Sequence, residues 1–243
     1  MNVYWVEQVE ADVPAGNSWM GPREMVRFGS FRFAKRRADW RLGRWTAKQA
    51  VAFCLNLPSD AEALIAIEIC PAASGAPEVF VNQGHAPVAI SLSHREGRAM
   101  CAIARSDVRI GCDLEAIETH SDAFVADYFT AEEQHLLGNG ADRLRGIALL
   151  WSAKESALKA LHEGLRLDTR TVSASFESEC PNTQGWGQLH VRYGGQVFGG
   201  WWQQGGNLVQ TIVTDAPCKV PIRLPVTSVL GLGFSSELAF SAP

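Results

Sequence analysis

Asp113 and Glu115 stand two residues apart in the stretch Val108-Arg-Ile-Gly-Cys-Asp-Leu-Glu115, where apolar and polar residues alternate. This alternation is typical of a half-buried strand, and residues two apart then project from the same face. Two neighbouring carboxylates repel each other, so such a strand either exposes both to water or neutralises them with a cation. Oxygen ligands of this kind suit a hard ion such as Mg²⁺, which leaves positions open for substrate phosphates and water.

A second group of charged residues lies in a helix predicted over residues 141–163. Apolar residues recur there at 3.6-residue spacing, and Gly164 is a natural stop. Lys154 projects from the apolar arc, where a buried charge needs a partner. Glu155 and Lys159 lie one turn apart on the shoulder of that arc. They form either an ordinary surface ion pair or part of a site in which Glu155 is a third ligand beside the two strand carboxylates.

Basic side chains are concentrated between Arg32 and Lys48, which hold seven of the 22 Lys and Arg against one acid, Asp39. Residues 35–55 predict a helix that ends before Pro58. Three arginines recur on it at helical spacing: Arg37, Arg41 and Arg44. The simplest interpretation is a solvated basic face. The alternative is a phosphate site, because the planar fork of Arg can bind phosphate oxygens bidentately.

Composition indicates a globular protein and argues against several classes. Hydrophobic residues make up 47% of the 243-residue chain, charged residues make up 20%, and mean hydropathy is −0.04, which argues against disorder and against a membrane protein. A net charge of −4 argues against a general nucleic-acid binder. An acidic protein with one basic segment instead suits a compact polyanion.

The cysteines and the N-terminus predict a cytoplasmic protein. There is no Cys-x-x-Cys and no Cys/His cluster at zinc spacing, so the six cysteines read as reduced, mostly core residues. They are Cys54, Cys70, Cys101, Cys112, Cys180 and Cys218. The first residues lack the basic and apolar segments of a signal peptide.

His94 is expected at a strand end, because the strand predicted over 88–93 closes in Ser91-Leu-Ser-His94. A lone histidine is more often a surface or hydrogen-bonded residue than a functional one. Strands predicted at 99–104 and 108–115 suggest an antiparallel hairpin. That hairpin would bring the residues after His94 beside Asp113.

Glu133 has two interpretations. Thr130 and Glu133 have the spacing of a capping box that opens a helix, which accounts for Glu133 without chemistry. A role as a catalytic base is the alternative.

The order of elements suggests two related halves, because each contains a charged helix followed by several strands. Further strands are expected at 3–9, 64–69, 78–81, 171–176, 188–193, 196–202 and 208–213. We expect a half over 1–105 that carries the basic helix, a half over 106–215 that carries the metal and catalytic residues, and an unassigned tail over 216–243. No residue-level repeat is apparent.

Four motifs, in this order and at these separations, resemble the 4′-phosphopantetheinyl transferases of the long, surfactin- or enterobactin-synthetase-activating type. They are Ser91-x-Ser-His94, Gly111-x-Asp-x-Glu115, Tyr128-Phe-x-x-x-Glu133 and Trp151-x-x-Lys-Glu-x-x-x-Lys159. The basic segment resembles the Lys-Arg-Arg-x-(acid)-x-x-x-Gly-Arg signature of the enterobactin-type members, with Lys35, Arg36, Arg37, Asp39, Gly43 and Arg44. The resemblance covers roughly residues 35–176.

The resemblance implies an α+β fold of two similar halves, a pseudo-dimer in which each half is a helix packed on a mainly antiparallel sheet, with a coenzyme A cleft between them. It implies transfer of the phosphopantetheine arm of coenzyme A to a serine of an apo acyl or peptidyl carrier protein, with release of adenosine 3′,5′-bisphosphate. A monomer without nucleic-acid or membrane partners is the expected state. Fatty-acid, polyketide and nonribosomal-peptide carriers are not distinguished.

The resemblance also implies roles for individual residues. The ligands of Mg²⁺ or Mn²⁺ would be Asp113, Glu115 and Glu155. The groups that bind coenzyme A would be Arg36, Arg44, Ser93, His94, Lys154 and Lys159. Our own hypothesis adds that Glu155, directly or through a metal-bound water, takes the proton of the carrier serine. Lys159 would then stabilise the leaving bisphosphate, and Lys154 would assist at the pyrophosphate. Phosphoryl transfer depends mainly on such positioning and charge neutralisation.

One departure and two alternatives stay open. Many family members carry Gly-Lys-Pro before the Ser-His motif, whereas this chain has Gly75-Ala76-Pro77, so one expected cation is missing and its role could pass to the Arg36–Arg44 group. The alternatives are a non-catalytic module that binds coenzyme A or a carrier protein, and a Mg²⁺-dependent phosphoesterase.

Overall fold

A computed structural model of the chain describes residues 1–177, 182 and 184–225. These residues form two compact units. The N-terminal unit comprises Tyr4–Asp107 and the chain from Ile222, and the C-terminal unit comprises Met1–Val3 and Val108–Pro221. The main chain therefore passes from one unit to the other between Asp107 and Val108. Of the predicted tail 216–243, residues 226–243 lie outside the described residues.

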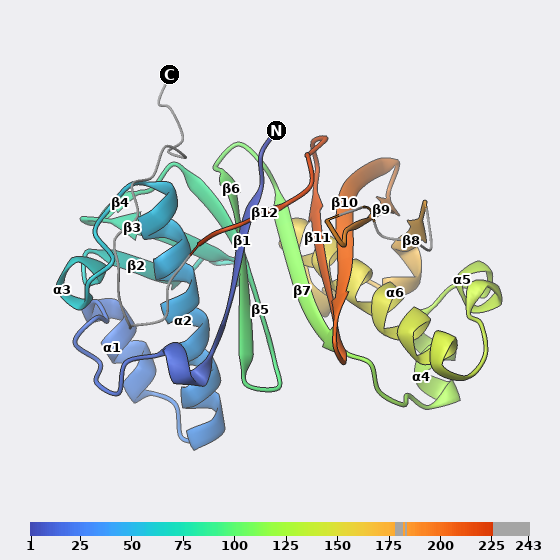
Figure 1. Cartoon of the computed structure of the whole chain (residues 1–243), viewed down its shortest axis with the longest axis horizontal. Helices are drawn as coiled ribbons and strands as arrows, with labels where there is room; N and C mark the ends of the chain where they lie inside the picture. The colour runs from blue at the N-terminus through green and yellow to red at the C-terminus, as the bar shows by residue number, and fades with distance from the viewer. Residues whose placement is uncertain (178–181, 183, 226–243) are drawn as a thin grey trace. The chain divides into compact units, whose positions relative to one another are not determined.

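The N-terminal unit packs helices against two sheets (Figure 1). Its elements are β1 Tyr4–Val9, α1 Pro22–Gly29, α2 Ala34–Cys54, α3 Ala61–Leu64, β2 Ile67–Pro71, β3 Pro77–Val81, β4 Gly84–His85, β5 Val88–Arg95, β6 Arg98–Arg105 and β12 Ile222–Arg223. One sheet has the order β12-β1-β6-β5, and the other has the order β2-β3-β4. All of these strand pairs are antiparallel except β1 with β12.

The C-terminal unit packs its longest helix against one antiparallel sheet with the order β7-β11-β10-β9-β8 (Figure 1). Its elements are β7 Ile110–Ala116, α4 Asp122–Tyr128, α5 Ala131–Leu136, α6 Gly140–Ala160, β8 Ser173–Phe176, β9 Gly187–Tyr193, β10 Gln196–Gly205 and β11 Leu208–Thr214. Helix α6 lies on β7 and β11. The predicted α+β class, with helices on mainly antiparallel sheets, is confirmed.

The two long helices form where periodicity predicts them. On α2, the side chains of Leu42, Trp45, Gln49 and Ala52 are buried, as expected for its inward side. Helix α6 ends at Ala160, before the predicted stop at Gly164, because His162 adopts a left-handed backbone with φ of 59°. The amide of Glu163 then donates to the carbonyl of Leu158 at 3.2 Å, which closes the last turn.

The predicted hairpin between 99–104 and 108–115 is wrong. Strand β6 has β1 on one edge and β5 on the other, so no edge of β6 remains for β7. Strand β7 pairs instead with β11 along its whole length, from Ile110 opposite Thr214 to Ala116 opposite Leu208. The hairpin that contains β6 is formed with β5, across the turn at Glu96. Strand pairing therefore gives no reason to place His94 beside Asp113.

Each unit holds one buried ion pair between a long helix and the N-terminal turn of a short helix. Lys48 of α2 lies 2.5 Å from Glu24, and Lys154 of α6 lies 2.7 Å from Glu133, with at most 3% of any of these side chains exposed. Both lysines lie fourteen residues beyond the first residue of their helix (34 to 48 and 140 to 154). Burial lowers the pKa of both lysines, and the glutamates oppose that shift.

The surrounding contacts repeat as well. Each lysine donates to two backbone carbonyls, Trp19 and Leu64 in the N-terminal unit and Tyr128 and Thr169 in the C-terminal unit. Each glutamate accepts from the residue three positions before it and from a strand amide: Gly21 and Ile69, or Thr130 and Ala174. Edge-on aromatic pairs follow the same pattern: Trp19 with Trp45, and Tyr128 with Trp151. The same set of contacts therefore recurs in the two units, although many of the residues that make them differ.

The cysteines and helices add two smaller findings. The free cysteines among the described residues are Cys54, Cys101 and Cys112, which are buried, and Cys70 and Cys218, which are partly exposed. Cys180 lies outside the described residues. Within the described ranges, no helix has both the length and the apolar character needed to cross a bilayer.

The variant Lys154→Met should lower the free energy of unfolding by about 3–5 kcal/mol, because it leaves the buried Glu133 carboxylate without its cation. Urea denaturation followed by circular dichroism measures this loss, with Lys35→Met as the control because the Lys35 side chain is 91% exposed. Adding Glu133→Gln to Lys154→Met should recover part of the loss. A Lys154→Met protein within about 1 kcal/mol of the wild type would contradict the assigned role.

Candidate functional site

The close packing of β7 on α6 brings the strand carboxylates to the helix. Gly111, Asp113 and Glu115 alternate along β7 and so project from one face. A Cβ on Gly111 would overlap the carbonyl oxygen of Ser156 in α6, so that face lies against the helix. Glycine is required at 111 because any side chain would push α6 away. The approach lets a short aspartate side chain reach groups on the helix.

Asp113, Glu155 and Lys159 form the charged centre of the C-terminal unit. The Nζ of Lys159 donates to Asp113 Oδ1 at 2.6 Å and to the carbonyl of Cys112 at 3.1 Å. Burial raises the pKa of Glu155, the nearby Asp113 carboxylate raises it further, and Lys159 opposes both. Burial would lower the pKa of Lys159, but the surrounding carboxylates outweigh it and the net shift is upward.

These residues meet part of the requirement for a hard cation. The Oε1 of Glu155 is buried and has no hydrogen-bond partner among the described residues, so it can accept a ligand bond. Among the described residues, no three His, Cys, Asp or Glu side chains form a metal-site group. Asp113 interacts electrostatically with Glu155, and Glu115 is a half-buried residue on the same strand face as Asp113, so the predicted triad stays a prediction. Lys159 supplies the positive charge beside Asp113.

Lys154 and Glu133 have structural roles. The three N–H groups of Lys154 are matched by Glu133 and by the carbonyls of Tyr128 and Thr169, all within 3.0 Å, and the side chain is fully buried. Lys154 therefore links separate segments of the unit, and its predicted contact with coenzyme A stays a prediction. Glu133 and Thr130 form the predicted capping box, and the second oxygen of Glu133 accepts from Ala174.

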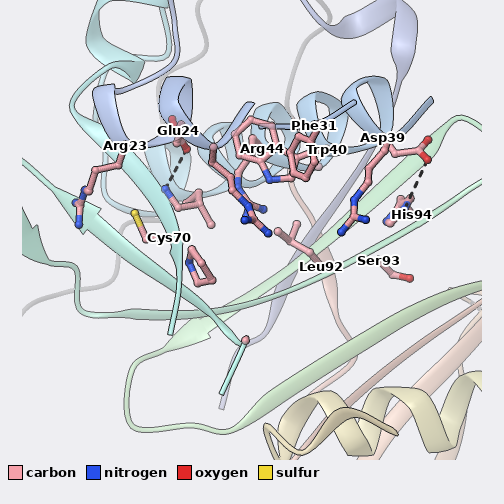
Figure 2. Close-up of a pocket in the computed structure, with 16 residues that line it drawn as sticks. Arg23, Glu24, Phe31, Asp39, Trp40, Arg44, Cys70, Leu92, Ser93 and His94 are labelled. Carbon is pink, nitrogen blue, oxygen red and sulfur yellow. Dashed lines mark hydrogen bonds and ion pairs between the residues drawn. The ribbon is translucent and has the colours of Figure 1, made fainter. Parts of the chain in front are cut away.

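A cavity of about 790 Å³ lies in the N-terminal unit between α1, α2, β2 and β5 (Figure 2). Its lining includes the four cofactor residues predicted in this unit: Arg36, Arg44, Ser93 and His94. The structure thus brings together side chains from a helix and from a strand some fifty residues later. Lys154 and Lys159, the other two predicted contacts, belong to the C-terminal unit.

Guanidinium groups stacked on aromatic rings make the cavity strongly basic. Arg44 lies over Trp40 at 4.9 Å, and Arg27 and Arg36 lie over Phe31 at 5.3 and 5.2 Å. Burial lowers the pKa of Arg44, whose buried Nε has no hydrogen-bond partner among the described residues. Arginine nevertheless keeps its charge. A buried cation with an unused donor favours an anionic ligand.

Sequence reasoning missed Arg23 and Arg27, which line the cavity from α1. Their signal was their four-residue spacing directly after Pro22, the first residue of α1. They add positive charge to the lining of the cavity. That lining also contains Gly75, which stands directly before Ala76, the position where the missing lysine was expected.

Of the three arginines at helical spacing on α2, only Arg44 lines the cavity. Arg37 donates to the carbonyl of Phe31 at 2.8 Å, and Arg41 donates to backbone carbonyls of the loop before α1. Both therefore stabilise chain segments, and helical spacing alone did not identify the arginine that lines the cavity.

Residues 109–207 match the family model described as the 4′-phosphopantetheinyl transferase superfamily. The match begins at β7 and contains the Asp113, Glu155 and Lys159 centre. It covers less than half of the 243-residue chain. It supports the predicted superfamily without distinguishing the long type from others. A search of curated proteins gives no match.

The variant Gly111→Ala should lower the free energy of unfolding by about 1–3 kcal/mol, because its methyl group forces α6 away from β7. It should also weaken the contact between Asp113 and Lys159. Urea denaturation measures the first effect, with Gly199→Ala as the control, since a Cβ at Gly199 meets nothing within 4 Å. Equal stability of the two variants would show that the close approach is not required.

Proposed function

We propose that this protein is a 4′-phosphopantetheinyl transferase of the long, surfactin- or enterobactin-synthetase-activating type. It moves the phosphopantetheine arm of coenzyme A to a serine of an apo acyl or peptidyl carrier protein. The observation that carries this proposal is the charged centre of Asp113, Glu155 and Lys159 within the segment that matches the superfamily. Two carboxylates and an ammonium group are suited to neutralising and positioning phosphates.

The cavity of the N-terminal unit is the proposed site for the nucleotide end of coenzyme A, which carries a 3′-phosphate and a pyrophosphate. Arg36 and Arg44 bind the 3′-phosphoadenosine end of coenzyme A, while Ser93 and His94 contact its phosphates. Stacking on Phe31 and Trp40 holds the two guanidinium groups in place, so little side-chain entropy is lost when an anion binds. Arg27 adds charge to the same wall.

Asp113 and Glu155 are the proposed ligands of a divalent cation, Mg²⁺ or Mn²⁺, with Glu115 as a third. Their oxygen-only donor set and the unused Oε1 of Glu155 suit a hard ion. When bound, that ion neutralises negative charge on the pyrophosphate. Lys159 contributes a fixed positive charge at the same centre and stabilises the leaving bisphosphate.

Transfer joins the serine Oγ of the carrier protein to the phosphorus that bears the pantetheine arm. The bond from that phosphorus to the bridging pyrophosphate oxygen breaks, and adenosine 3′,5′-bisphosphate leaves with the bonding electrons. The serine proton passes to Glu155. The raised pKa of Glu155 makes its carboxylate a stronger base than an exposed glutamate.

Intact mass spectrometry tests this function. Several apo carrier proteins are incubated with the protein, Mg²⁺ and coenzyme A, with EDTA and a carrier Ser→Ala variant as controls. A phosphopantetheine-sized gain on the carrier, absent from both controls, is the expected result. Binding of coenzyme A with no gain on any carrier would favour a non-catalytic module. Phosphate-ester hydrolysis without a carrier would favour a phosphoesterase.

The variants Asp113→Ala and Lys159→Ala should each lower turnover by about 10²- to 10³-fold, because each removes a preorganised charge from the reacting phosphates. Initial rates of carrier modification measure the loss. Lys219→Ala is the matched control, because Lys219 is an exposed lysine of the same unit. Near-normal rates in either active-centre variant would remove the basis for the assignment.

A further inference from the structure

Asp39 is a carboxylate in the wall of a cavity that four arginines and a second acid, Glu24, also line. It is the one acid between Arg32 and Lys48. Its Oδ2 lies 3.9 Å from the Nε2 of His94 and 3.5 Å from the Nζ of Lys35, and its side chain is only 18% exposed. Figure 2 shows the Asp39 carboxylate directed at the imidazole across the end of the cavity. An acid in this place would by itself repel an anionic ligand.

The other charged groups that line the cavity or lie next to His94 in the chain are mostly cationic. Helix α2 contributes Arg36 and Arg44 to the cavity, α1 contributes Arg23, Arg27 and Glu24, and β5 itself continues to Arg95. Glu24 is held by Lys48. From the neighbouring strand β6, Arg98 lies 2.7 Å from Glu7.

This arrangement bears on the protonation of His94. Neighbouring arginines disfavour a second positive charge on the imidazole, whereas a carboxylate in contact with the ring favours it. Asp39 makes such a contact with the ring of His94.

We propose that Asp39 is a positioning residue that keeps His94 protonated and oriented for a phosphate of the ligand. The proposal rests on the function proposed above, in which this cavity binds coenzyme A. The order of groups is carboxylate, imidazolium and phosphate, so that the central positive charge faces an anion on each side. A neutral histidine could donate one hydrogen bond to the phosphate but would carry no positive charge. A protonated histidine supplies the hydrogen bond and the positive charge together.

The direction in which Asp39→Asn changes the affinity for the anionic ligand distinguishes this role from simple repulsion. If Asp39 only repelled the ligand, Asp39→Asn would strengthen anion binding at every pH. If Asp39 maintains the imidazolium, Asp39→Asn loses the charge on His94 at a lower pH than the wild type does. Binding by the variant should then weaken earlier as pH rises.

The test measures binding of adenosine 3′,5′-bisphosphate by calorimetry between about pH 6 and pH 8.5, the range in which histidine titrates. In Asp39→Asn, the fall in affinity should move down by about half a pH unit, a roughly threefold loss on the alkaline side. NMR titration of the His94 ring should show a midpoint shift in the same direction. Asp39→Glu should restore both. Glu62→Gln, which removes an exposed acid of the same unit outside the cavity lining, is the control and should leave the profile unchanged.

Three outcomes would overturn the inference. Stronger binding by Asp39→Asn across the whole range would show repulsion alone, and an unchanged profile would show no coupling to His94. Either result, with normal binding by the wild type, would leave the proposed function intact. Absence of nucleotide binding by the wild type would overturn the proposed function and this inference together.

Discussion

The buried lysine–glutamate pair is the interaction on which each unit is organised. Lys154 joins α6 to the first turn of α5 through Glu133, and to the chain at Tyr128 and Thr169. Lys48 makes the equivalent ion pair between α2 and the first turn of α1. Two charges without exposure to water require partners for every donor and acceptor. Because the partners come from separate segments, the pair holds those segments in a single arrangement.

The repeated scaffold carries different chemistry in the two units. On α6 the lysine is followed at once by Glu155, and Lys159 lies one turn further on. At the same positions after Lys48, α2 has Gln49 and Phe53. The N-terminal unit instead places arginines in the turns before Lys48, toward a cavity. The same frame thus supports a carboxylate and lysine centre in one unit and an arginine-lined cavity in the other.

Local pattern was a good guide to the elements and a weaker guide to individual side chains. Period 3.6 predicted α2 and α6, and alternation predicted β7 with Asp113 and Glu115 on one face. The capping box at Thr130 was also present in the sequence. By contrast, Arg37, Arg41 and Arg44 share one helical spacing, yet only Arg44 enters the cavity. Spacing identifies a helix face, whereas the surrounding loops decide which arginine is used for backbone contacts.

The sequence by itself determined the class of fold and the long helices and strands, and it supplied the residues proposed for phosphate chemistry, because these depend on local periodicity and residue type. Only the tertiary structure decided that β7 pairs with β11 and that Lys154 forms a buried ion pair inside its unit. It also decided that Arg23 and Arg27 line the cavity. It also revealed the repeat, in which aromatic rings and backbone carbonyls of unlike residues fill equal roles. These features depend on contacts between segments far apart in the chain, and such contacts leave no periodic signal in any one segment.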